Sequence, residues 1–455
     1  MKKVHFVGIN GSGICGVACI AKNFGYEVDG CDMNAIGDYT HQLVTNGIKF
    51  LVGHDVSHLK DKDIVVISPA LLFKDKHKSI PEVTRAIETL PTIIWQKFLE
   101  DYIFRKQNVV VVSGTHGKTT TTTLTALMLE RLDPTAIIGG EVKEWKQSFR
   151  VGKSDWFVVE GDEYGGNFLN YNPRYLLINN LEMEHPEYFK DFDDYLDNFR
   201  KMFRNVQDNG KIIFPYFEEN ILNLINESKD YFRNKNVEIV CYDFVKRDTE
   251  FKFYLVEQGL GSVKINNETL VFKILGEHNM KNVISSSITA IECGIDCKEI
   301  QKVLDSFTGS KRRLDLVFEN DRIKIYDDYA HHHTQIKTTI EALKNNLEKN
   351  EKIIAILEPH LISRIAQNTE KYRQAMKIAD LPIITKIYKS RESDMEDPDM
   401  PKLINDNSIE YIENFDDILI RIRNYIFDNK EYKFRVLVMG AGYSYKLTKM
   451  LKNIC

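Results

Sequence analysis

The 455-residue sequence has no apolar run long enough to cross a membrane, although hydrophobic residues make up 43% of it. A membrane-spanning helix needs about 20 mostly apolar residues in succession. The first segment, MKKVHFVGINGSG, begins with two lysines as a signal peptide would, but glycines interrupt its apolar stretch at once. We therefore expect a cytoplasmic protein that is not inserted into a membrane.

Clustered basic residues are also absent. The 61 Lys and Arg residues and the 66 Asp and Glu residues are spread over the whole chain, for a net charge of −5. Proteins that bind nucleic acids or anionic membranes usually concentrate their basic residues. The charge distribution thus predicts no such partner, and any anionic ligand must be held by a local group of residues.

Cysteines paired at the spacing of metal-binding motifs are missing as well. The seven cysteines are an odd number and lie mostly in apolar or helical stretches, which suits a reducing cytoplasm. Cys15 and Cys19 are four residues apart in a predicted helix, and we interpret them as small buried apolar residues.

Internal repeats and low-complexity segments are not found either, but short apolar runs alternate with helical patterns along the chain. Such runs include VHFVGI, YEVDGCD, DIVVISPA, DWFVVEGDE, YLLINNLE, IKIYDDYA, KIIAILEP and FRVLVMGAG. The alternation predicts βαβ units with parallel sheets. We expect three α/β domains in series, over residues 1–106, 107–309 and 310–455. Two charge-rich stretches, 205–270 and 390–430, are predicted to be loops and edge structure.

The segment NVVVVSGTHGKTTTTTLTALMLERL, residues 108–132, has the pattern of a phosphate-binding turn. A β-branched run predicts a strand, the glycines predict a turn, and an apolar helical pattern follows. Backbone N–H groups at such a turn and the helix dipole both favour a phosphate. Gly114 and Gly117 permit close backbone approach, Lys118 can reach the β- and γ-phosphates, and the Thr119 hydroxyl can bind Mg²⁺.

This turn is a shortened P-loop, because only Thr115 and His116 separate its glycines. Thr120 is a candidate for a second phosphate contact, and the threonines after it are interpreted as ordinary helix residues. Magnesium prefers oxygen ligands, and of the acids that end the next strand we choose Glu160. His185 follows another strand, in NNLEMEHPEYF; a lone histidine is more often structural than catalytic.

A second glycine-rich turn lies near the N-terminus. Gly8, Gly11 and Gly13 follow a predicted strand and open a helix, which suits a diphosphate bound to backbone N–H groups. The register Gly11-Gly13-Gly16 gives G-x-G-x-x-G, and Asp32 ends the next strand in the ribose position of a dinucleotide site. By pattern alone, this turn predicts a nicotinamide-dependent oxidoreductase.

Nine motifs in order resemble the Mur ligases, the ATP-dependent synthetases that build the peptide of cell-wall precursors. They are HFVGINGSG, SGTHGKTTTT, EGDEY, NNLEMEHPEYF, GEHNMKN, GSKRRL, YDDYAHHHTQIK, EPHLISR and VMGAG. Their order and spacing cover nearly the whole chain, and the likeness is greatest to the members that join L-alanine to UDP-N-acetylmuramate. The oxidoreductase reading would leave the segment from Lys118 to His185 unexplained.

The resemblance implies an N-terminal Rossmann-like domain for the UDP-sugar, a central P-loop ATPase domain and a C-terminal Rossmann-like domain for the amino acid. It also implies ATP and Mg²⁺ as cofactors. ATP would phosphorylate the lactyl carboxylate to an acyl phosphate, which an amino group attacks to give an amide, ADP and phosphate. Positioned cations overcome the repulsion between the carboxylate and the triphosphate. The partners expected are these substrates, with a monomer or homodimer as the assembly.

The resemblance also carries over site residues. A first Mg²⁺ would use Thr119 and Glu160, and a second His185. The nucleotide would contact Gly114, Thr115, His116, Gly117, Lys118, Thr119, Thr120, His278, Asn279, Asn282, Arg312, Arg313 and Asp328. Catalysis would involve Lys118, His185, His331, His332 and Arg364. The UDP-sugar would contact Gly8, Asn10, Gly11, Ser12, Gly13 and Asp32, and the amino acid His360 and Arg364.

Five positions depart from the family pattern. Asn10 replaces a glycine, Glu184 an aspartate and His333 a proline, while Glu358 and Leu361 stand where alanine-adding members usually carry Gln and Arg. Losing that cation is not conservative. The Glu-Pro pair in EPHLISR resembles instead the ligase that recycles a preformed tripeptide, and a pseudomurein-type precursor ligase is a third alternative. We prefer addition of L-alanine.

Overall fold

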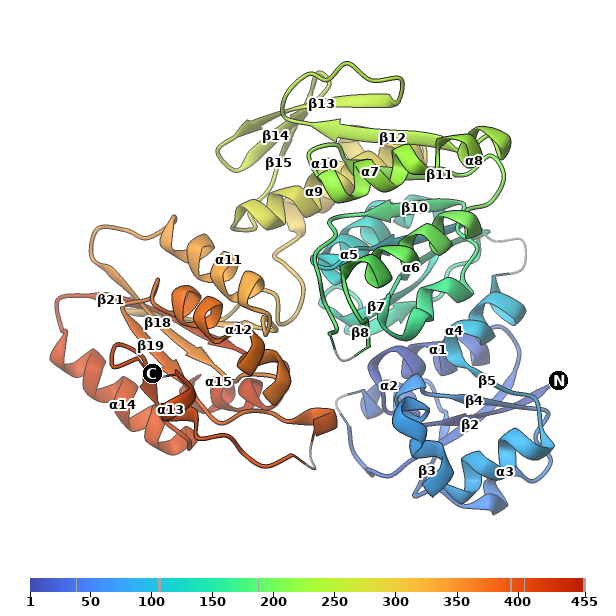
Figure 1. Cartoon of the computed structure of the whole chain (residues 1–455), viewed down its shortest axis with the longest axis horizontal. Coiled ribbons are helices and arrows are strands. Elements are labelled where there is room, and N and C mark those ends of the chain that lie inside the picture. Colours follow the sequence, from blue (N-terminus) through green and yellow to red (C-terminus); the bar gives the residue numbers. More distant parts are fainter. Residues whose placement is uncertain (38, 105–107, 187, 393–394, 405, 453–455) are drawn as a thin grey trace. The chain divides into compact units, whose positions relative to one another are not determined.

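The computed structural model describes residues 1–37, 39–104, 108–186, 188–392, 395–404 and 406–452 (Figure 1). The predicted boundary between residues 106 and 107, and Cys455, lie outside the described residues. The chain divides into two compact units: residues 1–271 with 282–305, and residues 272–281 with 306–455. Within the described ranges, no helix combines the length and apolarity that crossing a bilayer requires.

The N-terminal sheet of the first unit has five parallel strands in the order β3-β2-β1-β4-β5, drawn in blue in Figure 1. The strands are β1 (Lys3–Val7), β2 (Glu27–Asp32), β3 (Lys49–Val52), β4 (Ile64–Ile67) and β5 (Thr92–Ile94). The helices are α1 (Ser12–Asn23), α2 (Thr40–Thr45), α3 (Pro81–Thr89) and α4 (Trp95–Phe98). The strand order reverses direction at β1, which is where open α/β sheets bind ligands at the carboxyl ends of their strands.

The central sheet has ten strands in the order β15-β14-β13-β12-β11-β10-β6-β9-β7-β8. They are β6 (Asn108–Ser113), β7 (Thr135–Val142), β8 (Gln147–Arg150), β9 (Trp156–Glu160), β10 (Tyr175–Ile178), β11 (Lys211–Pro215), β12 (Glu238–Asp243), β13 (Lys252–Gly259), β14 (Ser262–Ile265) and β15 (Glu268–Val271). Its helices are α5 (Lys118–Met128), α6 (Phe192–Asn205), α7 (Glu219–Glu227), α8 (Lys229–Asn234), α9 (Glu277–Glu292) and α10 (Cys297–Ser306). Strand β6 pairs in parallel with β9 and β10, so the carboxyl ends of these three strands meet at one edge.

The sheet of the second unit has six strands in the order β16-β17-β21-β18-β19-β20, of which only β16 is antiparallel to its neighbour. The strands are β16 (Asp315–Glu319), β17 (Ile323–Asp328), β18 (Glu351–Leu357), β19 (Leu381–Ile384), β20 (Glu410–Tyr411) and β21 (Lys433–Met439). The helices are α11 (His333–Lys344), α12 (Ile362–Met376), α13 (Met400–Ile404), α14 (Phe415–Asp428) and α15 (Ser444–Lys452). Separate apolar clusters cover its two faces.

The prediction that residues 205–270 and 390–430 are loops and edge structure was partly wrong. The first stretch does end in the edge hairpins β13 to β15, but β11 and β12 are parallel strands inside the central sheet. The second stretch contains the long helix α14. Charged residues on the exposed faces of these elements hid the short apolar runs, such as KIIFP, that are buried beneath them.

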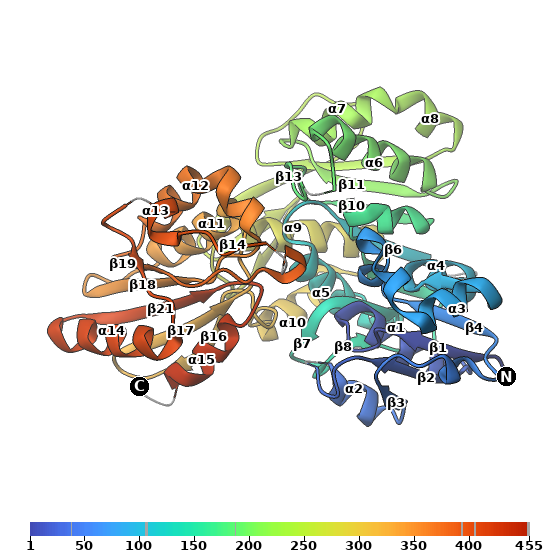
Figure 2. The same ribbon diagram turned by 60° about the horizontal axis from the view of Figure 1, so that its bottom comes forward.

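Helix α1 packs against the central part of the first unit as well as against its own sheet. Cys15 and Cys19 are fully buried in its core, as predicted from their apolar surroundings. Gly16 is where α1 meets β7 and β8: a Cβ there would lie 3.2 Å from Ile137 of β7 and 3.4 Å from Phe149 of β8. Figure 2 shows α1 beside these two strands.

Candidate active site

The turn at residues 114–117 joins β6 to α5, as its sequence predicted. Gly114 and Gly117 both have positive φ angles, +122° and +79°. A Cβ on Gly114 would lie 3.0 Å from the backbone of Asn179, and one on Gly117 would lie 2.3 Å from Oδ1 of Asn282. Both positions therefore require glycine. Because α5 begins at Lys118, the N–H groups of its first turn lie at this loop, where an anion is favoured.

Lys118 is held at the turn by backbone carbonyls and one buried acid. Its Nζ donates to the carbonyl oxygen of Gly114 at 2.6 Å and to Glu163 Oε2 at 2.9 Å. The Glu163 side chain is fully buried. Burial lowers the pKa of Lys118, but the carboxylates of Glu163 and Asp162 raise it by more, so the net pKa lies above its ordinary value. The ammonium group thus stays charged at neutral pH.

The structure brings the two predicted Mg²⁺ ligands of the P-loop side by side. The Thr119 hydroxyl donates to Glu160 Oε1 at 3.2 Å, and Gly139 N donates to Glu160 Oε2 at 2.9 Å. A Cβ on Gly139 would lie 2.5 Å from Glu160, so this glycine makes room for the carboxylate. A hydroxyl and a carboxylate oxygen are donors that suit Mg²⁺.

His185 lies after β10, beside the segment that follows β9. It has a positive φ of +56°, which is uncommon for a residue other than glycine. Its ring centroid is 4.9 Å from that of Tyr164, the residue after Glu163. The neighbouring Glu184, one of the departures from the family pattern, is buried. The histidine is thereby placed near the acids that end β9.

Several polar residues that the sequence did not single out hold the P-loop. His116 N donates to Asn180 Oδ1 at 2.8 Å, and the His116 ring lies 2.9 Å from a Glu182 carboxylate oxygen. The Thr115 hydroxyl forms a 2.8 Å hydrogen bond with the Tyr195 hydroxyl. The sequence signal that could have identified Asn180 was the pair NN directly after β10, because the strands next to a parallel P-loop strand end at the same edge of the sheet.

Thr121 is more than the ordinary helix residue that we predicted. Its hydroxyl donates to Asn282 Oδ1 at 3.1 Å and accepts from Asn179 Nδ2 at 2.9 Å. Thr122 and Thr123 behave as expected, since each hydroxyl donates to the carbonyl four residues earlier. Thr121 therefore links α5 to β10 and α9, and Thr120 is buried beside it.

Helix α9 carries three of the residues that the resemblance assigns to nucleotide binding. Asn282 belongs to the first unit and contacts Thr121, while His278 and Asn279 belong to the second. Asn279 Nδ2 donates to the carbonyl oxygen of Leu275 at 2.8 Å. Asn282 thus has a packing function at the P-loop that the sequence did not reveal.

The N-terminal turn is tied to the loop after β2 by its unusual asparagine. Gly8 has a φ of +78°, and Asn10 N donates to Asp32 Oδ2 at 3.1 Å. Asn10 Nδ2 donates to the Asn34 carbonyl at 2.9 Å, and its Oδ1 accepts from the Thr40 hydroxyl at 2.8 Å. Asn10 thus provides side-chain hydrogen bonds that the usual glycine could not make.

The G-x-G-x-x-G pattern at this turn is explained partly by packing. Gly11 caps α1, which begins at Ser12. A Cβ on Gly13 would lie 2.7 Å from the Trp95 ring, and Gly16 is the contact of α1 with β7 and β8. Two of the three glycines therefore let other elements approach α1, and the pattern is weak evidence for a dinucleotide.

In the second unit, Arg312 lies beside Asp327, one of the two acids that end β17. The Arg312 guanidinium donates to the Gly440 carbonyl at 2.6 Å and lies 3.5 Å from Asp327. Burial raises the pKa of Asp327 to about 6. Asp328 accepts from the backbone N–H groups of Leu314 and Ala330, at 2.5 and 2.6 Å, and its pKa is also raised by burial. Arg313 lies beside the Tyr329 ring, 5.0 Å from its centroid.

His331 and His332, both predicted to lie at the reaction site, make different hydrogen bonds. The ring of His331 donates from Nδ1 to the Tyr329 carbonyl at 2.9 Å, because a carbonyl only accepts. Burial and the Arg364 guanidinium hold the pKa of His331 well below its ordinary value, which leaves the ring neutral with an unprotonated Nε2. His332 instead caps α11, accepting from Thr334 N.

The motif EPHLISR forms the turn between β18 and α12. The ring centroids of His360 and His331 lie 5.2 Å apart, and Arg364 is 2% exposed. Glu358 accepts from Ser444 N at the start of α15 at 2.9 Å, and burial raises its pKa. Leu361 is fully buried with a φ of +68°, so it packs inside the unit where alanine-adding members carry an arginine.

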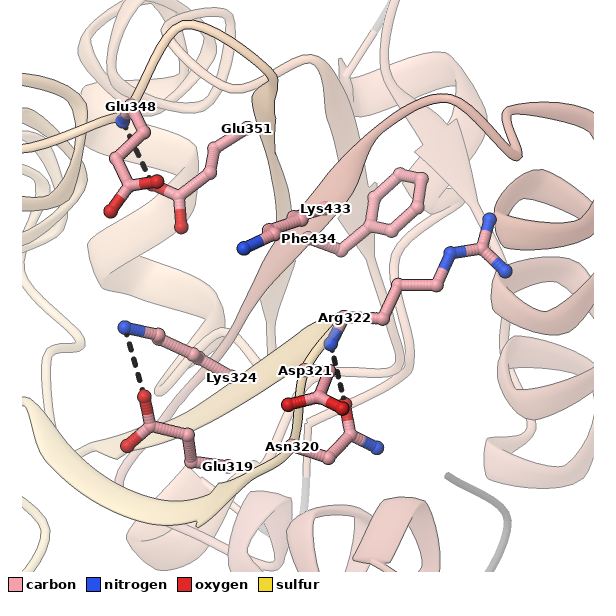
Figure 3. Close-up of a pocket in the computed structure, with 9 residues that line it drawn as sticks. All are labelled: Glu319, Asn320, Asp321, Arg322, Lys324, Glu348, Glu351, Lys433 and Phe434. Carbon is pink, nitrogen blue, oxygen red and sulfur yellow. Dashed lines mark hydrogen bonds and ion pairs between the residues drawn. The ribbon is translucent and has the colours of Figure 1, made fainter.

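A charged pocket in the second unit, shown in Figure 3, is not a candidate for this site. It lies at the amino ends of β17, β18 and β21, whereas open α/β sheets bind their ligands at the carboxyl ends. Several of its charged side chains already have partners: Lys324 pairs with Glu319 at 2.9 Å, and Glu351 accepts from the backbone N–H of Glu348 at 2.9 Å.

Three domain families match the chain in order. Residues 3–92 match the Mur ligase family catalytic domain, residues 112–290 the Mur ligase middle domain, and residues 312–442 the Mur ligase glutamate ligase domain. A UDP-N-acetylmuramate–L-alanine ligase from Caldicellulosiruptor bescii is 33% identical over 435 residues, which cover 92% of each chain. The chain belongs to the Mur ligase family.

Solved structures agree with this membership. A UDP-N-acetylmuramate–alanine ligase from Thermotoga maritima superposes with a TM-score of 0.78 at 25% identity, covering 100% of this chain and 99% of the other. A murein peptide ligase from Psychrobacter arcticus shares the fold, with a TM-score of 0.69 at 23% identity and coverage of 100% and 98%.

As a Mur ligase, the protein is an ATP-dependent enzyme that forms an amide bond in the synthesis of peptidoglycan precursors. The predictions of the family, of the three-domain α/β architecture and of the enzyme class are therefore confirmed. The alternative of a nicotinamide-dependent oxidoreductase is not favoured.

Proposed function

We propose that this ligase joins L-alanine to the lactyl carboxylate of UDP-N-acetylmuramate. The observation that carries the proposal is the 33% identity, over 92% of the chain, to a protein named as the ligase of this reaction. The N-terminal turn at Gly8 would bind the UDP-sugar, the P-loop ATP, and the segment from residue 310 onward the amino acid. We also propose that the enzyme acts in the cytoplasm as a monomer or homodimer.

In the first step, the substrate carboxylate would attack the γ-phosphate of ATP, which breaks the bond to the β-phosphate and gives an acyl phosphate and ADP. Both reactants are anions, so cations must reduce their repulsion. The Lys118 ammonium, held at the P-loop, would lie against the phosphates. Thr119 and Glu160 would hold Mg²⁺, which supplies charge neutralisation at the phosphate oxygens, and His185 would serve a second ion.

In the second step, the amino group would attack the acyl carbon and phosphate would leave. The attacking amine must lose a proton, and a neutral imidazole is a suitable acceptor. His331 is proposed for this role because its Nε2 is unprotonated. The remaining carried-over residues are proposed to bind as the family does: His278, Asn279, Asn282, Arg312, Arg313 and Asp328 on the nucleotide, and His360 and Arg364 on the amino acid.

The test is mass spectrometry of the products made from Mg-ATP, UDP-N-acetylmuramate and a panel of amines. We expect the L-alanine adduct, with phosphate released only when both acceptor and amine are present. The amines should include the tripeptide because of Glu358 and Leu361. A tripeptide adduct without an alanine adduct would refute the proposed specificity and support the recycling reaction.

A further inference from the structure

A buried group of metal-ligating side chains lies in the N-terminal sheet, on residues to which the ligase reaction gives no function. One ligand atom from each of His5, Cys31, His58 and Glu82 lies within 4.8 Å of every other. Glu82 is their common neighbour: its Oε1 is 3.0 Å from His5 Nε2 and 3.1 Å from His58 Nδ1, and its Oε2 is 3.2 Å from Cys31 Sγ. His54 Nδ1 lies 3.3 Å from both Glu82 Oε2 and Cys31 Sγ. Three of the four residues are fully buried, and the His58 side chain is 14% exposed.

These residues come from four elements that the fold brings to one face of the sheet. His5 is in β1 and Cys31 in β2, and the register pairs His5 with Asp29 and Val7 with Cys31. Alternate strand residues point to the same face, so His5 and Cys31 share it. Glu82 is in α3, and His58 is in the short helix η1 (Val56–Leu59); both elements pack on this face.

A second observation independently points to a metal. His5 Nδ1 lies 2.7 Å from Asp29 Oδ1, on the side of the ring away from Glu82, and Lys62 pairs with the same carboxylate. A metal-ligating histidine almost always gives its other ring nitrogen to a carboxylate or carbonyl, which fixes its tautomer. If the Nδ1–H of a neutral His5 donates its hydrogen bond to Asp29, the unprotonated Nε2 points toward Glu82 and the other ligand atoms.

The charges also balance around a divalent cation. A Cys31 thiolate and the Glu82 carboxylate supply two negative charges, and Asp29 is neutralised by Lys62. The Cys31 thiol donates a hydrogen bond to Glu82 Oε2 at 3.2 Å. A bound metal would displace this thiol proton, as metal binding to cysteine commonly does.

We propose that His5, Cys31, His58 and Glu82 form a structural zinc site. Zinc favours four nitrogen, sulfur and oxygen ligands in a closed tetrahedral arrangement. Bond lengths in such sites place neighbouring ligand atoms about 3.3–3.6 Å apart. The contacts of Glu82 with the other three residues, at 3.0–3.2 Å, involve both of its oxygens and are close to this spacing. All four ligand atoms lie within 4.8 Å of one another and would adjust around the ion.

The site would brace the N-terminal glycine turn. The Cys31 carbonyl oxygen accepts from Gly8 N at 2.9 Å and from Ile9 N at 3.1 Å. Fixing the Cys31 side chain in the sheet therefore also fixes the backbone that holds this turn. The role is structural, because zinc would have four protein ligands and no open position for a substrate.

The first test is zinc and cobalt binding by the full-length protein, measured with excess Mg²⁺ present to occupy magnesium sites. After dialysis, elemental mass spectrometry should find about one zinc ion per protein chain. The melting temperature should be higher with zinc than after the metal is removed by a chelator. Cobalt should give a thiolate charge-transfer absorption band. A folded wild-type protein that binds neither metal under these conditions would overturn the proposal.

Matched variants locate the metal. Cys31→Ser should abolish the cobalt band, and His58→Ala should lower zinc retention at least tenfold. Cys297→Ser and His41→Ala are the controls, since Cys297 is partly exposed and the His41 side chain is 51% exposed, both outside the cluster. If folded Cys31→Ser binds as much zinc as wild type and keeps the cobalt band, the site is refuted. If this variant does not fold, the measurements on the wild-type protein decide the question.

Discussion

Lys118→Ala should damage both the stability and the chemistry of the ligase, and the two effects can be separated. The substitution leaves the fully buried Glu163 carboxylate without the ammonium group that lies 2.9 Å away. Removing one partner of a buried ion pair costs about 3–5 kcal/mol. At about 2 °C per kcal/mol for a unit of this size, the melting temperature should fall by about 6–10 °C.

Activity should fall for a different reason. Losing one group that stabilises charge in a transition state costs a factor of about 10²–10³ in kcat. Adding Glu163→Gln to Lys118→Ala removes the stranded charge but restores no cation. The double variant should therefore regain most of the lost stability and none of the lost activity.

The assay combines calorimetry with product formation measured by mass spectrometry, on wild type, both single variants and the double variant. Glu163→Gln alone is the control for removal of the acid. Two results would contradict the reasoning. Wild-type turnover by folded Lys118→Ala would exclude the proposed role of the lysine, and a double variant no more stable than Lys118→Ala would exclude the strong buried pair.

Three further predictions concern other parts of the molecule. Gly117→Ala should lower activity at least tenfold, because the new Cβ would lie 2.3 Å from Asn282 Oδ1. The control Gly294→Ala also has a positive φ, +89°, but its Cβ would meet no atom within 4 Å, and turnover should be unchanged. Equal effects of the two variants would exclude the clash with Asn282. Folding raises the pKa of Asp327 to about 6, so the protein loses stability as the pH rises from about 4 to 6 and the buried carboxyl group ionises. In urea titrations, the free energy of unfolding of Asp327→Asn should therefore gain about 2–3 kcal/mol on that of wild type between pH 4 and 7. A difference that stays constant with pH would refute this. Asn10→Gly should cost about 1–2 kcal/mol of stability, because the hydrogen bonds to Asn34 and Thr40 are lost. No change in the denaturation midpoint would show that these bonds are not stabilising.

Local patterns predicted the P-loop well. The β-branched run before Gly114 and the helix after Gly117 are short-range signals, and the turn conformation follows from the absence of a side chain at the two glycines. The partners of the loop could not be predicted in the same way. Asn282 lies far along the chain, and its contact with Thr121 depends on where α9 packs against α5.

The second unit gives a similar contrast. The strand-ending acids of YDDYAHH were visible in the sequence, but not that Asp328 would hold two backbone N–H groups while Asp327 lies beside Arg312. Two adjacent strand residues point to opposite faces, so their surroundings differ although their chemistry is the same. Only the packing on each face sets which carboxyl is paired.

The sequence by itself determined the α/β class, the positions of most strands, the P-loop and the family, because these depend on periodicity, turn residues and motif order. The tertiary structure decided that Glu163 pairs with Lys118 and that His5 meets Glu82, 77 residues away. The spacing of cysteines and histidines gave no sign of the group formed by His5, Cys31, His58 and Glu82, because its members lie on different strands and helices. Strand order and register bring such residues together, and neither can be read from local sequence.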